Sequence, residues 1–475
     1  MNSKLIVLST LFSIVAFSQI NDAKATMKYA LKNGSNDYYR VSVKGFICNR
    51  ETSDDILERD GKHDEIYLTS LSYLVNSQGN SIPSTAIKTK SKFLGDINGR
   101  GPENKWAMAG SAPGLLGGIQ SGDQIPDNEP WKNNALHSGD LLPFVLWEGE
   151  LKQGSDYAVI HPGIMEWDGP ADFLTNFWHN SFAAMVLKPG VGIASLPFRA
   201  LGIGNTDDYN NSPGVFPAPT VMQQFGNIFY RADLQSLSTS DFQKFHVGTD
   251  RPIDRPIGVE KSDIFNPLQI RLDYNTATTL SQRDFGYGRG IIPIVYRDRE
   301  DLKGEYTVFI SFEKITDASQ RDRMNITHAD NFDPISEYSF RSVHASDKET
   351  DILNGGMESN THVVLNNLLG LKSQRWTIKK ANQYYFHIKN QYNNLILDLL
   401  NQNDINGSNI VTSVPNGNDS QLWSFIRYCD GSWLVRNYKT KRVMEVYNAA
   451  SNVTAPLGQW DANFARNQRW FIEKK

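Results

Sequence analysis

The chain has few cysteines, little net charge and no hydrophobic run long enough for a membrane helix. Only two of its 475 residues are cysteines, which excludes a disulfide scaffold and a cysteine-based metal site. A formal net charge of −4 provides no basic excess that would attract nucleic acid or anionic lipid. The apolar run at residues 5–17 is shorter than the roughly 20 residues that a transmembrane helix needs, and no later stretch is apolar enough. We therefore expect no nucleic-acid partner and no transmembrane segment in the mature chain.

The short apolar run is instead typical of a targeting signal. Lys4 supplies positive charge ahead of it, and an Ala-x-Ala triplet at residues 23–25 offers a cleavage site. Residues 16–18 offer a second small-x-small exit, so the exact cleavage site stays open. We expect residues 1–25 to be a signal peptide and the protein to be secreted, to the extracellular space or a periplasm.

Length and composition indicate at least two domains rich in β-structure. A chain of 475 residues exceeds one ordinary core, and two is the simplest division. The 36 Gly, 20 Pro, 10 Trp, 19 Tyr and 24 Phe favour strands and turns. Cys48 and Cys429 would fall in different domains, where they either form one bridge or remain small buried side chains.

Strand-like segments dominate the first two-thirds of the chain. They combine β-branched and aromatic residues with partial alternation. The predicted strands are 38–48, 65–75, 141–151, 156–162, 268–274, 291–296 and 305–315. We interpret the first two as the opening strands of one antiparallel sheet, 94–134 as a long irregular loop and 172–187 as a helix. Residues 26–315 are thus predicted to form a large, sandwich-like β domain of unknown activity, and the polar residues 316–335 a linker.

An acidic connection lies between the first two predicted strands, at residues 51–65. It carries seven carboxylates within fifteen residues, and Ca²⁺ prefers several hard oxygen ligands in flexible geometry. The spacing differs from that of the helix-loop-helix calcium motif. Two interpretations stay open, a Ca²⁺ site and a solvated charged turn.

Glu166 and Asp168 are the candidate catalytic residues of this first domain. Two residues apart on a strand, they would share one face, with Trp167 between them. Paired carboxylates serve glycoside hydrolysis, one as the acid and the other as the nucleophile or base. A structural or metal-binding role for the same pair is the alternative, so enzymatic activity is left undecided.

The last third of the chain is organised by a repeat of 47 residues. The tripeptide Gln-x-Trp occurs three times with that step, and an acidic residue precedes each glutamine by 23 positions. The tripeptides are Gln374 to Trp376, Gln421 to Trp423 and Gln468 to Trp470; the acids are Asp351, Asp398 and Glu445. A period of this length marks one supersecondary unit used three times.

This pattern resembles that of the ricin B-chain-type β-trefoil lectins, over residues 336–475. The resemblance implies that the three tryptophans pack in a shared core. It also implies a shallow sugar pocket in each repeat, in which the acid accepts hydrogen bonds from sugar hydroxyls, an aromatic ring stacks on the sugar and an Asn before the Gln completes the rim.

The third repeat matches the family's pocket best. Trp460 stands at the stacking position, followed by Asn467 and Gln468, although Glu445 replaces the usual Asp. In the second repeat Asp398 is accompanied by Ser413 and Ser420, and in the first Asp351 by Asn366 and Ser373, so both lack the ring. A trefoil that keeps the fold without binding sugar remains an alternative.

We therefore expect a secreted carbohydrate-binding protein whose trefoil brings the β-rich domain to glycans or glycoconjugates. Two alternatives stay open: a toxin or adhesin with the trefoil as receptor binder, and a glycan-acting hydrolase with the trefoil as an accessory module. The three differ in what the first domain does, and its residues carry no nucleophile or zinc motif that would decide.

Overall fold

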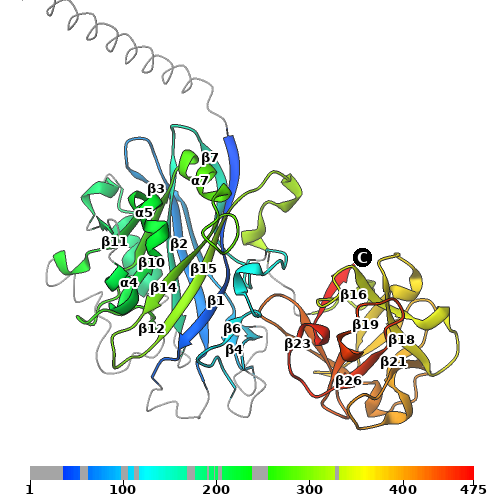
Figure 1. Ribbon diagram of the computed structural model, residues 1–475. Coiled ribbons are helices and arrows are strands. Elements are labelled where there is room, and N and C mark those ends of the chain that lie inside the picture. Colours follow the sequence, from blue (N-terminus) through cyan, green and yellow to red (C-terminus); the bar gives the residue numbers. More distant parts are fainter. Residues whose placement is uncertain are drawn as a thin grey trace, which may run out of the picture.

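A computed structural model describes most of the chain from Asn36 to the C-terminus. The described residues are 36–53, 63–97, 105–111, 117–137, 139–167, 177–189, 192–196, 198–201, 206–237, 255–326 and 331–475. The predicted signal peptide, residues 1–25, lies outside them. Two facing sheets form the N-terminal unit, and a third sheet of twelve strands forms the C-terminal unit beside it (Figure 1).

The first sheet is built around β1 (Asn36–Arg50), which pairs with β15 on one side and with β7 and β6 on the other. Its apolar residues are buried, as their β-branched and aromatic composition requires. Along the path the order is β10-β14-β15-β1-β6, with β7 also on β1. The partners are β6 (Gln124–Ile125), β7 (Phe144–Lys152), β10 (Gly214–Pro217), β14 (Ile291–Arg297) and β15 (Glu305–Lys314).

The second sheet has the order β5-β4-β2-β8-β13-β11-β9, with β3 on β2 and β12 on β8. Its long strands, β2 and β8, pair over ten residues. The strands are β2 (Ile66–Val75), β3 (Ser81–Lys90), β4 (Phe93–Gly95), β5 (Trp106–Met108), β8 (Tyr157–Glu166), β9 (Phe198–Ala200), β11 (Phe229–Ala232), β12 (Arg255–Pro256) and β13 (Leu268–Leu272).

The two sheets face each other, which confirms the predicted sandwich-like β architecture. The Tyr296 hydroxyl on β14 donates to the Pro162 carbonyl on β8, at 3.2 Å, across the space between the sheets. The prediction that 38–48 and 65–75 are strands of one sheet is wrong, because β1 lies in the first sheet and β2 in the second. Both segments are buried over most of their length. Their composition therefore does not show whether the two strands pair within one sheet or face each other in two sheets.

Helices are short and lie around the sandwich. The predicted helix at 172–187 is present as the π-helical turn η5 and the helix α3, and residues 172–176 lie outside the described ranges. In α7 the carboxylate of Asp273 caps the helix by accepting from the Thr276 N–H at 2.7 Å. The helices are η4 (Pro130–Lys132), η5 (Phe177–Phe182), α3 (Ala183–Val186), η6 (Ile193–Ser195), α4 (Thr206–Asn211), α5 (Pro219–Phe225), η7 (Gly226–Ile228), η8 (Leu234–Ser236), α7 (Tyr274–Gln282), η10 (Ala318–Gln320) and η11 (Arg323–Asn325).

The C-terminal unit is a β-trefoil, as predicted. Six strands close a barrel through the pairings β16·β19, β19·β20, β20·β23, β23·β24, β24·β27 and β27·β16, and three hairpins, β17·β18, β21·β22 and β25·β26, complete it. The strands are β16 (Tyr338–Ser342), β17 (Lys348–Ile352), β18 (Thr361–Asn367), β19 (Trp376–Lys380), β20 (Phe386–Asn390), β21 (Ile396–Leu399), β22 (Ile410–Ser413), β23 (Trp423–Arg427), β24 (Trp433–Asn437), β25 (Val443–Val446), β26 (Leu457–Trp460) and β27 (Trp470–Lys474).

The 47-residue step of the sequence is also the step of the structure. Each repeat contributes four strands and two short 3₁₀ turns, one after the acid and one ending at the Gln of Gln-x-Trp. These turns are η12 (Leu353–Gly355), η14 (Leu400–Gln402) and η16 (Tyr447–Ala449), and η13 (Lys372–Gln374), η15 (Asp419–Gln421) and η17 (Arg466–Gln468). Trp376, Trp423 and Trp470 are buried in one core, the role that the resemblance implies for them.

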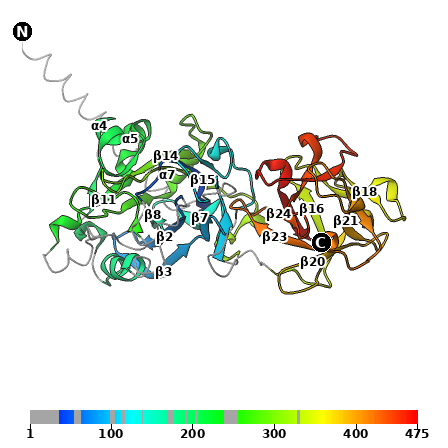
Figure 2. The same cartoon turned by 90° about the horizontal axis from the view of Figure 1, so that it is seen from below.

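The trefoil is joined to the sandwich by a packed interface on the side of β23 and β24 (Figure 2). The Cys429 N–H donates to the Met108 carbonyl at 2.9 Å, and the Leu142 N–H donates to the Cys429 carbonyl at 2.8 Å. The fully buried Arg469 contacts Asp127 of the N-terminal unit and Asp430. Hydrophobic residues of this edge of the trefoil therefore belong to the core of the sandwich.

The structure describes both cysteines and most of the predicted linker between the two units. Cys48 and Cys429 are both free and buried, so no bridge joins the units. The predicted linker, 316–335, packs on both units where it is described: the Met324 N–H donates to Glu148 on β7 at 2.8 Å, and the ring of Phe332 packs against that of Phe425 in the trefoil, with centroids 4.5 Å apart. In the described part of the chain, no helix has the length and apolar character that crossing a membrane would need.

Candidate functional site

The three acids of the repeats occupy equivalent places in the three hairpins. Asp351 lies on β17, Asp398 on β21 and Glu445 on β25, each buried, and each facing a residue of the next strand of its hairpin. The acids are thus fixed in a rigid β-hairpin beside the 3₁₀ turn that carries the glutamine. What surrounds them differs from repeat to repeat.

In the third repeat, Gln468 and Asn467 contact Glu445, and Trp460 lies on the partner strand of the same hairpin. Glu445 is 5% exposed, and its Oε2 accepts from Gln468 Nε2 at 3.0 Å and from Asn467 Nδ2 at 3.5 Å. Trp460 ends the partner strand β26 and is 37% exposed. Among the described residues Oε1 of Glu445 receives no hydrogen bond, so this oxygen can accept one from a ligand hydroxyl.

Glu445 is accommodated by changes around it. It lies opposite Gly458, whereas the two aspartates lie opposite Val364 and Val411. The ring of Tyr447 fills the space above this glycine, since a Cβ on Gly458 would lie 3.1 Å from the Tyr447 ring. Tyr447 also meets Trp460 edge to face, with ring centroids 6.3 Å apart, so the predicted third pocket has two aromatic rings in contact.

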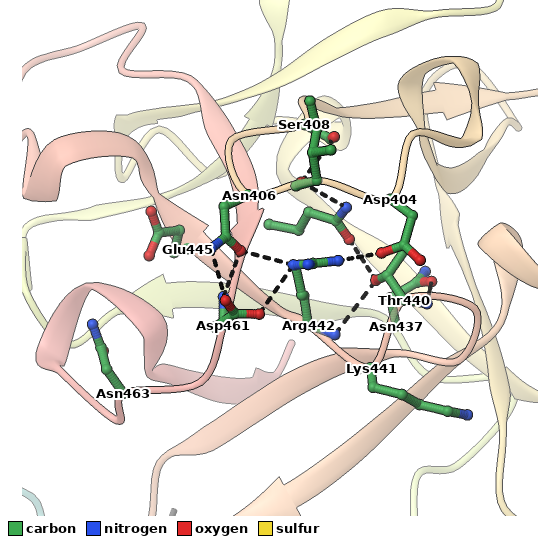
Figure 3. A network of polar contacts seen from close by, with 12 residues as sticks. Asp404, Asn406, Ser408, Asn437, Thr440, Lys441, Arg442, Glu445, Asp461 and Asn463 are labelled. Carbon is green, nitrogen blue, oxygen red and sulfur yellow. Dashed lines mark hydrogen bonds and ion pairs between the residues drawn. The ribbon is translucent and has the colours of Figure 1, made fainter.

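A polar cluster from two repeats includes Arg442, Asn406 and Asp461 (Figure 3). Arg442 donates from Nε to Asn406 Oδ1 at 2.7 Å and forms ion pairs with Asp404 and Asp461. The Asp461 N–H donates to Asn406 at 2.9 Å, and the buried Gln459 donates to the Asn403 carbonyl at 2.9 Å. Both neighbours of Trp460 are therefore anchored to the loop of the second repeat, which fixes the place of the ring.

Burial sets the electrostatics of the third pocket. Desolvation raises the pKa of the Glu445 carboxyl above its ordinary value, and the hydrogen bonds from Gln468 and Asn467 oppose this rise. The acid is thus held as an acceptor by two amides, while its protonation takes place at a higher pH than for an exposed glutamate.

The second repeat has the acid without an aromatic wall. Asp398 accepts from Gln421 Nε2 at 2.9 Å and from the Leu399 N–H at 2.7 Å. Ser413 stands where the third repeat has Trp460, and it bonds to Asn360. No ring is therefore offered at this place, as the sequence indicated.

In the first repeat the acid lines an open pocket of about 490 Å³. Asp351 accepts from Asn366 Nδ2 at 2.9 Å and from the Ile352 N–H at 2.8 Å. Here the glutamine of the tripeptide, Gln374, holds the preceding loop: its Nε2 donates to the Asn367 carbonyl at 2.6 Å. Asn366 thus takes over the bond to the acid that Gln421 and Gln468 make in the other repeats.

The candidate catalytic pair of the sandwich is described only in part. Glu166 ends β8 in the interior and forms an ion pair with Arg255 at 2.8 Å, and Arg255 also pairs with Asp298 at 2.7 Å. Trp167 is partly buried against Trp106, with ring centroids 4.7 Å apart, rather than standing free beside the acids. Asp168 lies outside the described residues, so their relative placement stays a prediction.

The candidate Ca²⁺ loop, 51–65, is likewise described only at its ends. Residues 54–62 lie outside the described ranges; at the ends, Glu51 contacts His63, and Asp64 accepts from the Thr52 N–H at 3.0 Å. Within the ranges that the structure does describe, no group of three or more His, Cys, Asp or Glu residues is placed to hold a metal ion.

Sequence reasoning missed the supporting residues of the third pocket. Tyr447 and Gly458 follow from no repeated pattern, because both break the 47-residue step, where the other repeats have leucine and valine. Arg442 was missed because two of its partners, Asp404 and Asn406, come from the preceding repeat. The departure of Tyr447 and Gly458 from the residues at the same positions of the other two repeats was the one signal of these supporting residues in the sequence.

Comparison with known proteins supports the reading of the C-terminal unit. The model of the family described as "Ricin-type beta-trefoil lectin domain-like" matches residues 372–460, so this part of the chain is a ricin-type trefoil of the lectin-like kind. No curated protein matches the chain.

Several solved structures are similar to part of this chain at low identity. The agglutinin of Rhizoctonia solani is 15% identical, with 31% of this chain and 100% of that one covered, at a TM-score of 0.28. A Polyporus squamosus lectin is 17% identical, covering 30% and 50%, at 0.27. An exo-β-1,3-galactanase of Clostridium thermocellum is 17% identical, covering 45% and 40%, at 0.29, so this chain spans less than half of that enzyme.

Proposed function

We propose that the protein binds carbohydrate through its trefoil and that the third-repeat pocket is a principal site. One observation carries the proposal: the carboxylate of Glu445, held by Gln468 and Asn467, lies on the same hairpin, β25·β26, as the partly exposed ring of Trp460. A charged acceptor orients sugar hydroxyls, and the ring covers the apolar face of the sugar. The ricin-type character of residues 372–460 supports the same assignment.

Shallow pockets of this kind bind single sugars weakly, so the ligand is best sought among presented glycans. A glycan array should be probed with the full chain and with Trp460→Ala. Loss of the stacked ring removes about 1 kcal/mol or more, roughly a fivefold loss of affinity. Trp460→Phe keeps an aromatic face and should retain most of the binding.

Tyr384→Ala is a suitable control, because Tyr384 is an exposed aromatic residue of the same unit. It should leave the array unchanged. Equal binding by the wild type and Trp460→Ala would remove the third repeat from the proposal, and no binding by the wild type would leave the trefoil as a scaffold.

We further propose that the protein is secreted and that the trefoil presents the sandwich unit to glycan-bearing surfaces. The apolar run and cleavage triplet at residues 1–25 support secretion. The packed interface around Arg469 supports presentation in one fixed orientation. N-terminal sequencing of the exported protein tests the first point: a mature chain that still begins at Met1 would contradict it.

A further inference from the structure

A comparison of the three repeats shows a second position from which an aromatic ring reaches a pocket. In the first repeat, Tyr392 lines the pocket of Asp351, although it belongs to the second repeat. One step of 47 later stands Lys439, whose Nζ reaches across to the Gln402 carbonyl at 3.1 Å; one step earlier stands Ala345. The first pocket thus has a ring from its neighbour, the third has its own, and the second has neither.

The place of Tyr392 is well defined. Its N–H donates to Asn390 Oδ1 at 3.0 Å, and Asn393 Nδ2, one residue on, donates to the Gly356 carbonyl of the first repeat at 3.1 Å. The ring packs on Gly355, where an added Cβ would lie 3.7 Å from it. Tyr392 is nevertheless 46% exposed, so part of the side chain remains accessible to a ligand.

An apolar loop borders the same pocket. Leu371 lines it, and Leu368 and Leu369 precede it on the loop; all three are 48–54% exposed. Gln374 fixes this loop by accepting from the N–H groups of Leu369 and Leu371 at 3.1 and 3.3 Å. The equivalent residues are Pro415, Asn416 and Asn418 in the second repeat and Ala462, Asn463 and Ala465 in the third. The leucines are thus peculiar to the first repeat and not a requirement of the fold.

We propose that the first-repeat pocket binds a glycoside that carries an apolar substituent. Sugar hydroxyls would donate to Asp351, whose carboxylate oxygens keep lone pairs beyond the bonds they already accept, while the sugar face lies on Tyr392. The apolar substituent covers Leu371 and the leucines beside it, removing them from water. A volume of about 490 Å³ accommodates a monosaccharide with a short chain.

This inference rests on the proposed carbohydrate binding of the trefoil, but it concerns a different pocket and a different ring. The two can therefore fail separately. Loss of binding in Trp460→Ala reports on the third repeat, and loss in Tyr392→Ala on the first.

Titration calorimetry on the full chain tests the proposal with paired methyl and octyl β-glycosides of galactose, glucose and N-acetylglucosamine, below micelle formation. At least one octyl glycoside should bind about tenfold more tightly than its methyl partner, the gain from burying about two methylene groups. Leu371→Ser should remove that gain, Tyr392→Ala should weaken both partners, and Tyr392→Phe should restore binding.

Ile405→Ser and Trp460→Ala are the controls, since Ile405 is an exposed apolar side chain outside the pocket. Both should keep the preference for the octyl glycoside. Equal affinity for octyl and methyl partners, an absence of binding by every octyl glycoside, or a preference that survives Leu371→Ser would overturn the proposal. Melting temperatures close to that of the wild type show that the variants, all at exposed positions, are folded.

Vesicles distinguish the two sources of such a glycoside. Phosphatidylcholine vesicles with galactosylceramide, glucosylceramide or neither are mixed with the protein and sedimented. Binding only to glycolipid vesicles, lost in Leu371→Ser, identifies a membrane glycolipid; octyl-glycoside binding without vesicle binding identifies a free glycoside. Equal binding to plain vesicles contradicts the requirement for sugar.

Discussion

The first and third repeats of the trefoil surround equivalent acids with different chemistry. In the third, Glu445 shares a hairpin with Trp460, whose ring meets that of Tyr447 from the same repeat. In the first, Asp351 faces Tyr392 from the next repeat and an apolar loop. One backbone thus supports two pockets whose rings approach from different directions.

This difference shows that the surroundings of each acid include residues of the neighbouring repeat as well as those of its own. The barrel core keeps the three tryptophans because the fold needs them. The surface between repeats is free to vary, and there each pocket borrows from its neighbour: Tyr392 for the first, and the Asn406 loop that fixes Trp460 for the third.

The largest expected difference between the repeats concerns the middle residue of Gln-x-Trp. Arg469→Ala should lower the free energy of unfolding by about 3–5 kcal/mol, because the guanidinium is fully buried between Asp430 and Asp127. Arg375→Ala, the matched change in the first repeat, removes one ion pair, with Glu349, and should cost about 1–3 kcal/mol. Urea denaturation followed by tryptophan fluorescence measures both. A loss for Arg375→Ala as large as that for Arg469→Ala would contradict this interpretation of the interface.

The next largest effects are expected from substitutions of the two acids, each of which should lower ligand affinity at one pocket only. Glu445→Gln should weaken ligands that depend on Trp460 about tenfold or more, since a charge-assisted hydrogen bond is lost, and should spare those that depend on Tyr392. Asp351→Asn should do the reverse. Calorimetry with one ligand of each group decides; parallel losses in both variants would show that the pockets are not independent.

The pH dependence should identify the third pocket. Burial raises the pKa of Glu445, so its ionised form, and with it the affinity, is complete above that pKa and declines as the pH falls through it. The titration is best made in Tyr392→Ala, which leaves the third pocket as the reporter. In Glu445→Gln the affinity should not change with pH. A pH dependence as steep as before in that variant would assign the titration to another group.

Arg442 should give the smallest effect, because it acts only through the loop that holds Trp460. Arg442→Ala should lower affinity at the third pocket about twofold to threefold and leave the first unchanged. Within the described ranges, Lys348, the equivalent residue of the first repeat, forms an ion pair only with Asp347 beside it, so Lys348→Ala is the matched control. A larger loss for Lys348→Ala than for Arg442→Ala would refute this positioning role.

Much of the architecture could be predicted from the sequence, because repetition carries it. The 47-residue step indicates the trefoil, and long apolar segments such as 305–315 predict the strands of the sandwich. The strand β3 was missed because its residues, from Ser81 to Lys90, are mostly polar and at most partly buried. The sheet to which β1 and β2 belong was misjudged because burial on both faces leaves no pattern that distinguishes pairing from facing.

The site could be predicted only within one repeat. Glu445, Trp460, Asn467 and Gln468 could be named as candidates because their places are counted from the tripeptide. Tyr392 was not, since a residue that serves the neighbouring pocket carries no mark of it in the sequence. The sequence also gave no signal for Arg469, because its partner Asp127 lies in the other unit. The ion pair of the buried Glu166 could not be predicted either, because its partner Arg255 is distant in the sequence.

The central claim is that two differently built pockets of one trefoil bind glycans independently. It is tested most directly by one glycan array, printed with both polar and apolar linkers and probed with the wild type, Trp460→Ala, Tyr392→Ala and the double variant. We predict that each single variant loses a different set of glycans and that the double variant loses both. Identical losses in the two single variants, or binding that persists in the double variant, would contradict it.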